Sequence, residues 1–220
     1  MISGEANPVL EATGLNFSYN KKQDLIKGLD IRVMPGEIVG ISGENGSGKS
    51  TLLKLLVGLL KPQGGALEKS GRIGYSPQEL LLFENLTILE NFRVFGKGMG
   101  LKQTEIDHEV DQILQQLHYS RYKNTLVKNL SGGTAQKANF GISLLGDPTV
   151  LILDEPYQGM DYASFSAFWD LQYELRKKGK AIVIVSHLIE DKTKFTRSLH
   201  LINGRLQTCP QRECPMCAGK

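Results

Sequence analysis

The hydrophobic pattern opens with two segments of partial alternation, residues 9–19 and 26–33, separated by the polar stretch 20–24 (NKKQD). The alternating apolar positions are Leu15, Phe17, Tyr19, Leu29, Ile31 and Val33. Alternation with a period of two is typical of strands that bury one face. The pattern therefore predicts a small antiparallel sheet near the start of the chain.

Other short runs are apolar almost throughout. Residues 37–42 (EIVGIS), 149–156 (TVLILDEP) and 180–187 (KAIVIVSH) have the composition of buried parallel strands, and residues 71–78 (GRIGYSPQ) predict a further strand that ends at Gln78. Residues 51–60 (TLLKLLVGLL) are apolar on nearly all sides, which predicts a buried helix ended by residues 61–65 (KPQGG).

The middle of the chain has a helical period instead. In residues 104–119 the apolar side chains are spaced for one helix face, with Thr104 as the expected N-cap. They are Ile106, Val110, Ile113, Leu114 and Leu117. We expect residues 86–145, approximately, to form a helical subdomain inserted into a single α/β domain that spans residues 1–220.

Composition narrows the class of protein. A chain of 220 residues with 40% hydrophobic and 22% charged residues is ordinary for a folded domain. The net charge of +3 gives no reason to expect nucleic acid as a partner. No apolar run approaches the roughly 20 residues that span a bilayer, and the first ten residues lack the layout of a secretion signal. We therefore expect a cytoplasmic protein that reaches a membrane only through a partner.

All cysteines, Cys209, Cys214 and Cys217, fall in a C-terminal tail at about residues 207–220. A disulfide framework is therefore not expected to hold the fold. Structural zinc takes four ligands, and the tail offers three thiols. A packed or disordered tail, a metal site, and redox or lipid attachment remain open for it.

The nine residues 43–51 (GENGSGKST) lie between a predicted strand and a predicted helix. In that context the spacing of Gly43, Gly48, Lys49 and Ser50 is typical of a loop that binds nucleotide phosphates. Gly46 adds backbone freedom to the loop. The backbone amides from Asn45 to Thr51, Ser47 included, would surround the phosphates, with Lys49 on the β- and γ-phosphates and Ser50 on Mg²⁺.

Polar side chains follow two of the predicted parallel strands. Asp154 and Glu155 end one strand and His187 ends the other, and ligands of open α/β sheets bind at these carboxyl ends. We expect Asp154 to hold Mg²⁺ or its water, Glu155 to polarise the attacking water, and His187 to contact the γ-phosphate. Helix capping, a surface ion pair or a structural histidine would explain each residue taken singly.

A second anion-binding nest is expected where Ser131, Gly132 and Gly133 open a helix. With this motif the chain resembles the nucleotide-binding subunit of an ATP-binding cassette (ABC) transporter, over about residues 10–206. The segment GENGSGKST resembles the family's Walker A motif, LSGGT its signature and LILDE its Walker B motif. YSPQE resembles its Q-loop, YQGMD its D-loop and VSH its switch histidine.

The resemblance implies a P-loop NTPase (RecA-like) core with an N-terminal antiparallel β subdomain and a helical insertion. It implies ATP and Mg²⁺ as cofactors, Tyr19 on the adenine, Gln78 among the groups at Mg²⁺, and ATP hydrolysis coupled to transport. It also implies a head-to-tail dimer in which Ser131–Gly133 of one chain meets the Walker A motif of the other. Membrane permease subunits would dock near Gln78 and the helical subdomain, with residues 81–92 (LLFENLTILENF) as the expected surface.

The chain departs from the family pattern at Thr134, where the signature usually has glutamine, and at Tyr157-Gln158 in the D-loop. The short cassette and the 81–92 segment favour an exporter over an importer. A soluble ABC ATPase of an assembly scaffold, of the iron–sulfur type, and a regulatory module clamped by ATP remain alternatives.

Overall fold

The computed structural model describes residues 7–20, 24–187 and 191–208. Its strands are β1 (Leu10–Phe17), β2 (Ile26–Val33), β3 (Ile38–Ser42), β4 (Gly64–Lys69), β5 (Ile73–Ser76), β6 (Val150–Asp154), β7 (Ala181–Val185), β8 (Arg197–Ile202) and β9 (Arg205–Thr208). Its α-helices are α1 (Lys49–Val57), α2 (Ile88–Gly98), α3 (Gln103–Gln116), α4 (Gly132–Ser143) and α5 (Tyr162–Lys177). Short 3₁₀ helices cover Ser120–Tyr122, Val127–Asn129 and Lys192–Lys194. The cysteines of the tail lie outside the described residues.

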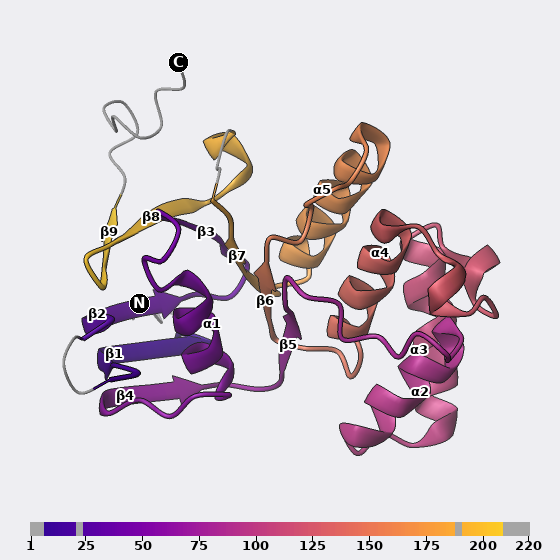
Figure 1. Cartoon of the computed structure of the whole chain (residues 1–220), viewed down its shortest axis with the longest axis horizontal. Helices are drawn as coiled ribbons and strands as arrows, with labels where there is room; N and C mark the ends of the chain where they lie inside the picture. Colours follow the sequence, from indigo (N-terminus) through magenta and orange to yellow (C-terminus); the bar gives the residue numbers. More distant parts are fainter. Residues whose placement is uncertain (1–6, 21–23, 188–190, 209–220) are drawn as a thin grey trace, which may run out of the picture.

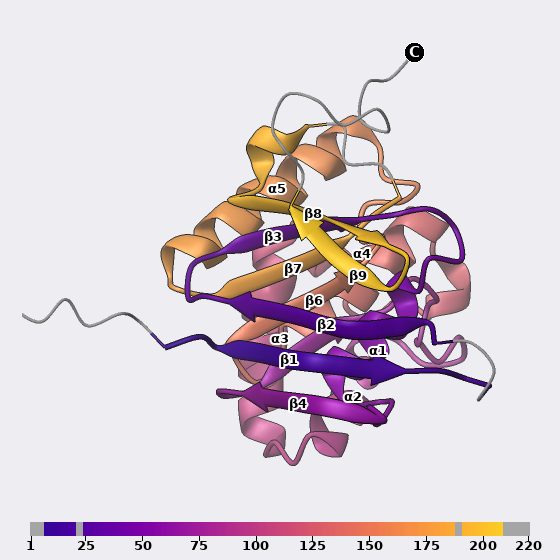
Figure 2. The same cartoon turned by 90° about the vertical axis from the view of Figure 1, so that its left-hand side faces the viewer.

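Two sheets organise the fold (Figure 1, Figure 2). The first has the order β2-β1-β4 and is antiparallel, which confirms the predicted sheet near the start of the chain. The second has the order β5-β6-β7-β3-β8-β9 and is parallel except for β9, which pairs with β8 antiparallel. Asn203 and Gly204 turn that last hairpin with φ of 51° and 81°, as a tight two-residue turn requires.

The strands β3, β6 and β7 are buried at every position because both of their faces are covered. On β6, Val150 and Ile152 pack into a core shared with α1 and the three-stranded sheet. Leu151 and Leu153 pack on the opposite face, among the helices α2 to α5. Figure 1 shows this division, with α1 beside the first sheet and the other helices beyond the strands.

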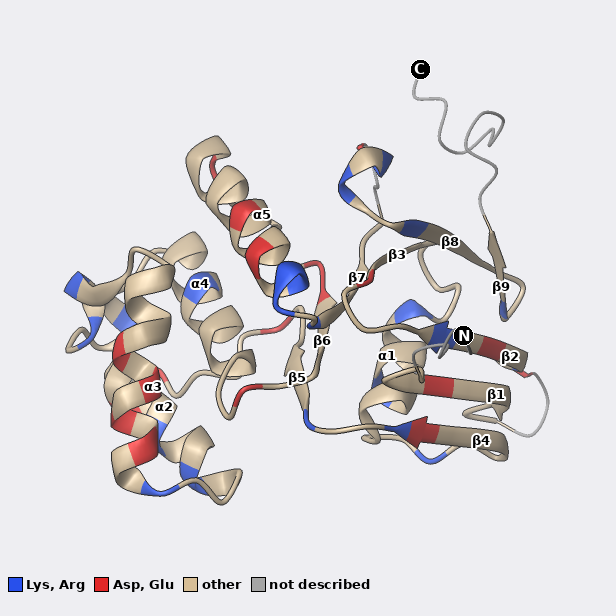
Figure 3. Ribbon diagram, turned by 180° about the vertical axis from the view of Figure 1, so that it is seen from behind, with Lys and Arg blue, Asp and Glu red and all other residues tan. Residues whose placement is uncertain are grey.

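Residues 86–145 contain α2, α3, α4 and two 3₁₀ helices. Arg93 on α2 donates to Asp107 on α3 at 2.8 Å, and Lys123 pairs with Asp111 of α3. Figure 3 shows acidic positions repeated along α3. These bridges link the connected helices, although exposed ion pairs of this kind each contribute only about 0–1 kcal/mol to stability.

Two local predictions were wrong. The helix expected over residues 51–60 ends at Val57, because Gly58 adopts φ 91° and caps it. The helix expected to begin after Thr104 starts at Gln103, with Lys102 as N-cap and Thr104 inside the first turn. The strand β4 was missed, because its sequence GGALEK is rich in residues that strands disfavour.

No helix in the described part of the chain is long and apolar enough to cross a bilayer.

Candidate functional site

The loop between β3 and α1 leaves the start of α1 open. Gly46 and Gly48 have φ of 80° and 102°, a region that costs other residues strain. Gly48 is the N-cap of α1, and no side chain of the described residues caps this helix N-terminus. The amides of the first turn are therefore available to a ligand, and the positive end of the helix dipole lies at the same point. This is the local geometry of an anion site.

A cavity of about 350 Å³ lies against this helix start. It is lined by residues that were predicted from the sequence to form the site, together with Leu25. The predicted members are Asn45, Gly46, Gly48, Lys49, Ser50, Thr51, Gln78, Asp154, Glu155 and His187. They come from the loop after β3, from α1, and from the segments that follow β5, β6 and β7. The carboxyl ends of three parallel strands thus meet the glycine-rich loop.

The Lys49 side chain lies along the loop. Its ammonium donates to the carbonyl oxygens of Gly43 at 2.8 Å and Glu44 at 2.9 Å. These oxygens hold a full positive charge beside the cavity, where it can meet an anion.

Asp154, at the end of β6, is only 5% exposed. Burial raises the pKa of its carboxyl, and the hydrogen bond from the Ser50 hydroxyl acts in the opposite direction. A nearby cation would compensate for the cost of keeping this carboxylate charged.

The donor set of the cavity fits magnesium. Ser50 offers a hydroxyl, Gln78 a carboxamide oxygen and Asp154 a carboxylate, all hard oxygen ligands of the kind that Mg²⁺ prefers. Among the described residues, no group of three or more histidine, cysteine, aspartate and glutamate side chains is arranged to hold a metal ion. The residues of the cavity therefore suit a magnesium ion whose remaining ligands would be water or phosphate oxygens.

Glu155 is held in a constrained conformation. Its φ is 48°, and its backbone N–H donates to the Val185 carbonyl at 2.9 Å. Its buried carboxylate accepts from the Ser186 hydroxyl at 2.9 Å and from the His187 backbone N–H. The His187 Nδ1 lies 2.9 Å from the same carboxylate. A left-handed non-glycine residue fixed by this many contacts is typical of a functional position.

Tyr19 lies beside the cavity without lining it. It is 61% exposed, and its hydroxyl is 3.3 Å from the Thr51 hydroxyl. Its ring meets Phe17 edge to face, with ring centroids 5.0 Å apart.

Gly43 and Ser47 line a neighbouring cavity of about 320 Å³, which also contains His200. His200 Nδ1 lies 2.6 Å from the Ser42 hydroxyl, so a side chain of β8 contacts the end of β3 directly before the loop.

Ser131, Gly132 and Gly133 stand apart from this cavity, at the N-terminus of α4. The Ser131 hydroxyl accepts from the Thr134 amide at 3.3 Å and lies 2.6 Å from the Thr134 hydroxyl. Ser131 and Gly132 are exposed. Within one chain, therefore, the segment Ser131–Gly133 does not meet the glycine-rich loop before α1.

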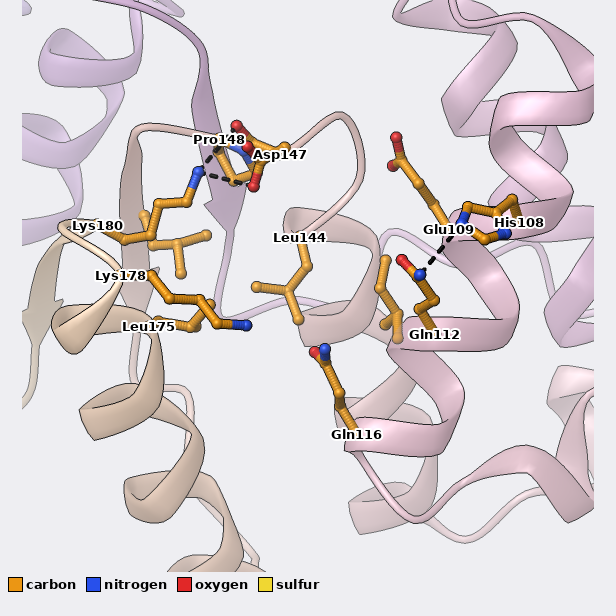
Figure 4. Close-up of a pocket in the computed structure, with 12 residues that line it drawn as sticks. His108, Glu109, Gln112, Gln116, Leu144, Asp147, Pro148, Leu175, Lys178 and Lys180 are labelled. Carbon is orange, nitrogen blue, oxygen red and sulfur yellow. Dashed lines mark hydrogen bonds and ion pairs between the residues drawn. The ribbon is translucent and has the colours of Figure 1, made fainter.

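A cavity of about 370 Å³ lies at the opposite ends of the strands, between α3 and α5 (Figure 4). Three of its charged side chains have clear partners: Lys180 pairs with Asp147 at 2.7 Å, and Glu109 accepts from the Gly146 amide at 2.6 Å. Because it lies where β6 and β7 begin, it is remote from the loop and carboxylates described above.

Comparison with known proteins identifies the family. The sequence profile described as ABC transporter matches residues 26–158. The chain belongs to the ABC transporter family. An uncharacterized ABC transporter ATP-binding protein of Methanocaldococcus jannaschii is 34% identical over 183 residues, which is 83% of this chain and 70% of that protein. The Nod factor export ATP-binding protein I of Cupriavidus pinatubonensis is 32% identical, over 82% of this chain and 59% of that protein.

The cassette also matches part of much longer relatives. Mouse ATP-binding cassette sub-family A member 9 is 35% identical over 84% of this chain, and the match covers 12% of that protein. Among solved structures, the ATP-binding subunit of an ABC transporter superposes with a TM-score of 0.82 at 27% identity, covering 90% of this chain and 88% of that chain. The predicted fold class is confirmed, and the chain is an ABC ATPase cassette.

Three residues that shape the site were not predicted from the sequence. Leu25 lines the cavity and lies beside Gly48 of the glycine-rich loop, Ser186 binds Glu155, and the side chain of Gln158 binds Gln78. Ser186 could have been suspected from its place directly before His187. The other two contacts depend on how distant segments fold together.

Proposed function

We propose that this ABC cassette binds ATP with Mg²⁺ in the cavity at the start of α1, hydrolyses it, and couples hydrolysis to transport by membrane permease subunits. The observation that carries the proposal is the convergence of Lys49, Asp154 and Glu155 on one cavity.

Binding begins at the phosphates. The open amides of α1 and the Lys49 ammonium supply positive charge at one end of the cavity. Tyr19, exposed beside Thr51, supplies an aromatic face for the adenine.

Ser50, Gln78 and Asp154 would hold Mg²⁺. The ion would neutralise charge on the β- and γ-phosphates. Burial of Asp154 supports this assignment, since a buried carboxylate is most stable beside a cation.

Glu155 accepts a proton from the attacking water, and its contacts with Ser186 and His187 keep the carboxylate in place. Since His187 meets Glu155 through Nδ1, its Nε2 remains to face a phosphate oxygen. Donation from both nitrogens requires the protonated ring.

The exposed N-terminus of α4 suits a role toward a second chain. Ser131–Gly133 of one copy would approach the phosphates bound at α1 of the other, in a head-to-tail dimer. A side chain added at Gly132 would meet, outside its own helix turn, no atom of the described residues within 4 Å of its Cβ. Such open surroundings support the approach of a second chain.

The permease surface is a small part of the segment predicted for it. Leu81 and Phe83 are 51% and 52% exposed, whereas Leu82, Ile88 and Phe92 are buried in the core. The buried Asn91 holds the loop by accepting from the Phe83 amide at 2.7 Å and donating to the Thr87 carbonyl at 2.9 Å. A rigid loop that presents apolar side chains is suited to docking. Permease subunits bound there would place the cassette on the cytoplasmic face of a membrane.

Export is the direction we favour. The similar protein of C. pinatubonensis is named for Nod factor export, and the substrate of this chain would be chosen by the permease.

Replacing Glu155 by glutamine tests the hydrolytic assignment. The amide keeps the shape of the side chain but cannot accept the proton, so turnover should fall by on the order of 100-fold while MgATP still binds. Phosphate release and ATP binding are measured on the same preparation, with Glu68→Gln on the exposed part of β4 as control. Hydrolysis by Glu155→Gln at the wild-type rate would contradict the assignment.

Replacing Phe83 by glutamate tests the transport assignment. A charge on the exposed ring position should abolish co-purification with a polytopic membrane protein and leave ATP hydrolysis by the isolated chain within about twofold. Co-purification of the wild-type chain with a soluble scaffold instead would support the assembly alternative. Failure to find any partner while ATP drives dimer formation would support the regulatory module.

A further inference from the structure

The segment Tyr157-Gln158 follows the Glu155-Pro156 turn and departs from the family pattern. The Tyr157 ring is packed into an aromatic cluster, with centroids 5.5 Å from Phe165, 5.9 Å from Phe168 and 6.3 Å from Trp169. All three partners lie on α5. This packing fixes the segment against its own chain.

The backbone continues that constraint to the next residue. The Gln158 amide donates to the Glu155 carbonyl at 3.2 Å, which closes a turn that begins at a left-handed residue. Gln158 is therefore held between an anchored ring on one side and the fixed Glu155 on the other. Its own side chain is exposed and lies outside the nucleotide cavity.

From this position Gln158 reaches across to Gln78, a residue 80 positions earlier in the chain. The Gln78 Nε2 donates to the Gln158 Oε1 at 3.1 Å. Gln78 lines the nucleotide cavity, and Gln158 does not. The hydrogen bond thus joins a residue that lines the cavity to a residue outside the cavity lining.

The direction of this hydrogen bond has a chemical consequence. A carboxamide binds a hard cation through its oxygen and not through its nitrogen. In this contact Gln158 accepts from Nε2, which leaves Oε1 of Gln78 available to another partner. A serine or alanine at position 158 is too short to supply this acceptor.

We propose that Gln158 is a positioning residue that orients the Gln78 carboxamide with its oxygen available to the metal ion of bound MgATP. The proposal rests on the assignment of Gln78 to Mg²⁺ under the proposed function. Tyr157 supports it by anchoring the turn, which gives a joint role to both unusual residues of this segment.

The test measures metal binding directly, without using activity. Mn²⁺ replaces Mg²⁺, and free Mn²⁺ is followed by electron paramagnetic resonance in a Glu155→Gln background saturated with ATP. Gln158→Ser should raise the Mn²⁺ dissociation constant by about 3- to 10-fold, the scale of one hydrogen bond that orients a ligand. Gln158→Glu keeps an acceptor oxygen at the same reach and should restore affinity to the parent value or better.

Two controls separate this role from a general loss of structure. Gln115→Ser, at an exposed position on α3, should leave the Mn²⁺ dissociation constant unchanged. ATP binding in the presence of EDTA should be equal in all variants, since Lys49 and the loop amides are untouched.

A double variant decides whether Gln158 acts through Gln78. If it does, Gln78→Ala and the double variant Gln78→Ala/Gln158→Ser should bind Mn²⁺ equally. Additive losses would overturn the proposal. An unchanged affinity in Gln158→Ser, beside a weakened one in Gln78→Ala, would also overturn it and leave the proposed function standing. No effect of Gln78→Ala would instead remove Gln78 from the metal site of the proposed function.

Discussion

The helices α1 and α4 both have glycine at or next to their first residue, and their N-termini are capped in different ways. At α1 the N-cap is a left-handed glycine without a side-chain cap among the described residues, and a cavity with a lysine and buried carboxylates faces it. At α4 the N-cap is Ser131, whose hydroxyl accepts from the Thr134 amide of the same helix. The start of α1 is open to an anion, whereas the start of α4 is partly satisfied by its own serine.

The difference indicates that the two helix starts have different roles toward a nucleotide. Within one chain, the α1 site gathers a lysine and two buried carboxylates, the kinds of charged group that bind and cleave phosphates. The α4 start offers amides and a small exposed surface but, among the described residues, lines neither cavity at the glycine-rich loop. It can contribute to nucleotide handling only if a second copy presents its own α1 site, as the proposed dimer requires.

The largest expected effect comes from removing the charge at α1. Lys49→Ala deletes the ammonium that now rests on the Gly43 and Glu44 carbonyls, so ATP binding should weaken by about 100-fold, the upper range for a charge-assisted contact. Equilibrium binding of ATP with Mg²⁺ measures this. Lys54→Ala, exposed on the same helix, is the matched control and should change affinity by less than about threefold.

The smallest expected effect comes from the edge of the same site. Tyr19→Ala should weaken ATP binding by about 5- to 10-fold, corresponding to about 1 kcal/mol for a lost stacking contact. Tyr19→Phe loses only the hydroxyl near Thr51 and should bind ATP nearly as the parent does. Equal affinity in all three proteins, by the same binding assay, would assign the adenine contact to another residue.

A structural feature could be predicted from the sequence where it depends on neighbouring residues, and could not where it depends on contacts between distant segments. The strands β3, β6 and β7 were evident from continuous apolar runs, and the polar residues at their ends could be placed because parallel strands end at one edge. The strand β4 was not, since an edge strand written GGALEK has no strand-forming composition and is formed by pairing with β1.

The same limit applies within the site. Lys49 and Ser50 follow from a local pattern, and Glu155 from its place after a strand. The Gln78–Gln158 contact joins side chains 80 positions apart, and nothing in either segment's own sequence indicates it. The packing of Tyr157 on α5 is equally non-local, because it depends on where the turn after Glu155 directs the chain.

The most direct test of the different roles of α1 and α4 places a charge at the start of α4 and leaves α1 unchanged. Gly132 has open space around it within the described part of the single chain, so Gly132→Asp should fold normally, and its carboxylate should even favour the helix N-terminus. In a dimer the same carboxylate would face the phosphates of the partner's ATP and repel them.

The measurement is the molecular mass in solution of Glu155→Gln, with and without Gly132→Asp, in the presence of MgATP, of ADP and of neither. We predict a dimer only for Glu155→Gln with MgATP, and a monomer for the double variant even when its own α1 site is saturated with ATP. A dimer that forms equally well in the double variant, at the same ATP occupancy, would contradict the claim that α4 of one chain completes the site at α1 of another.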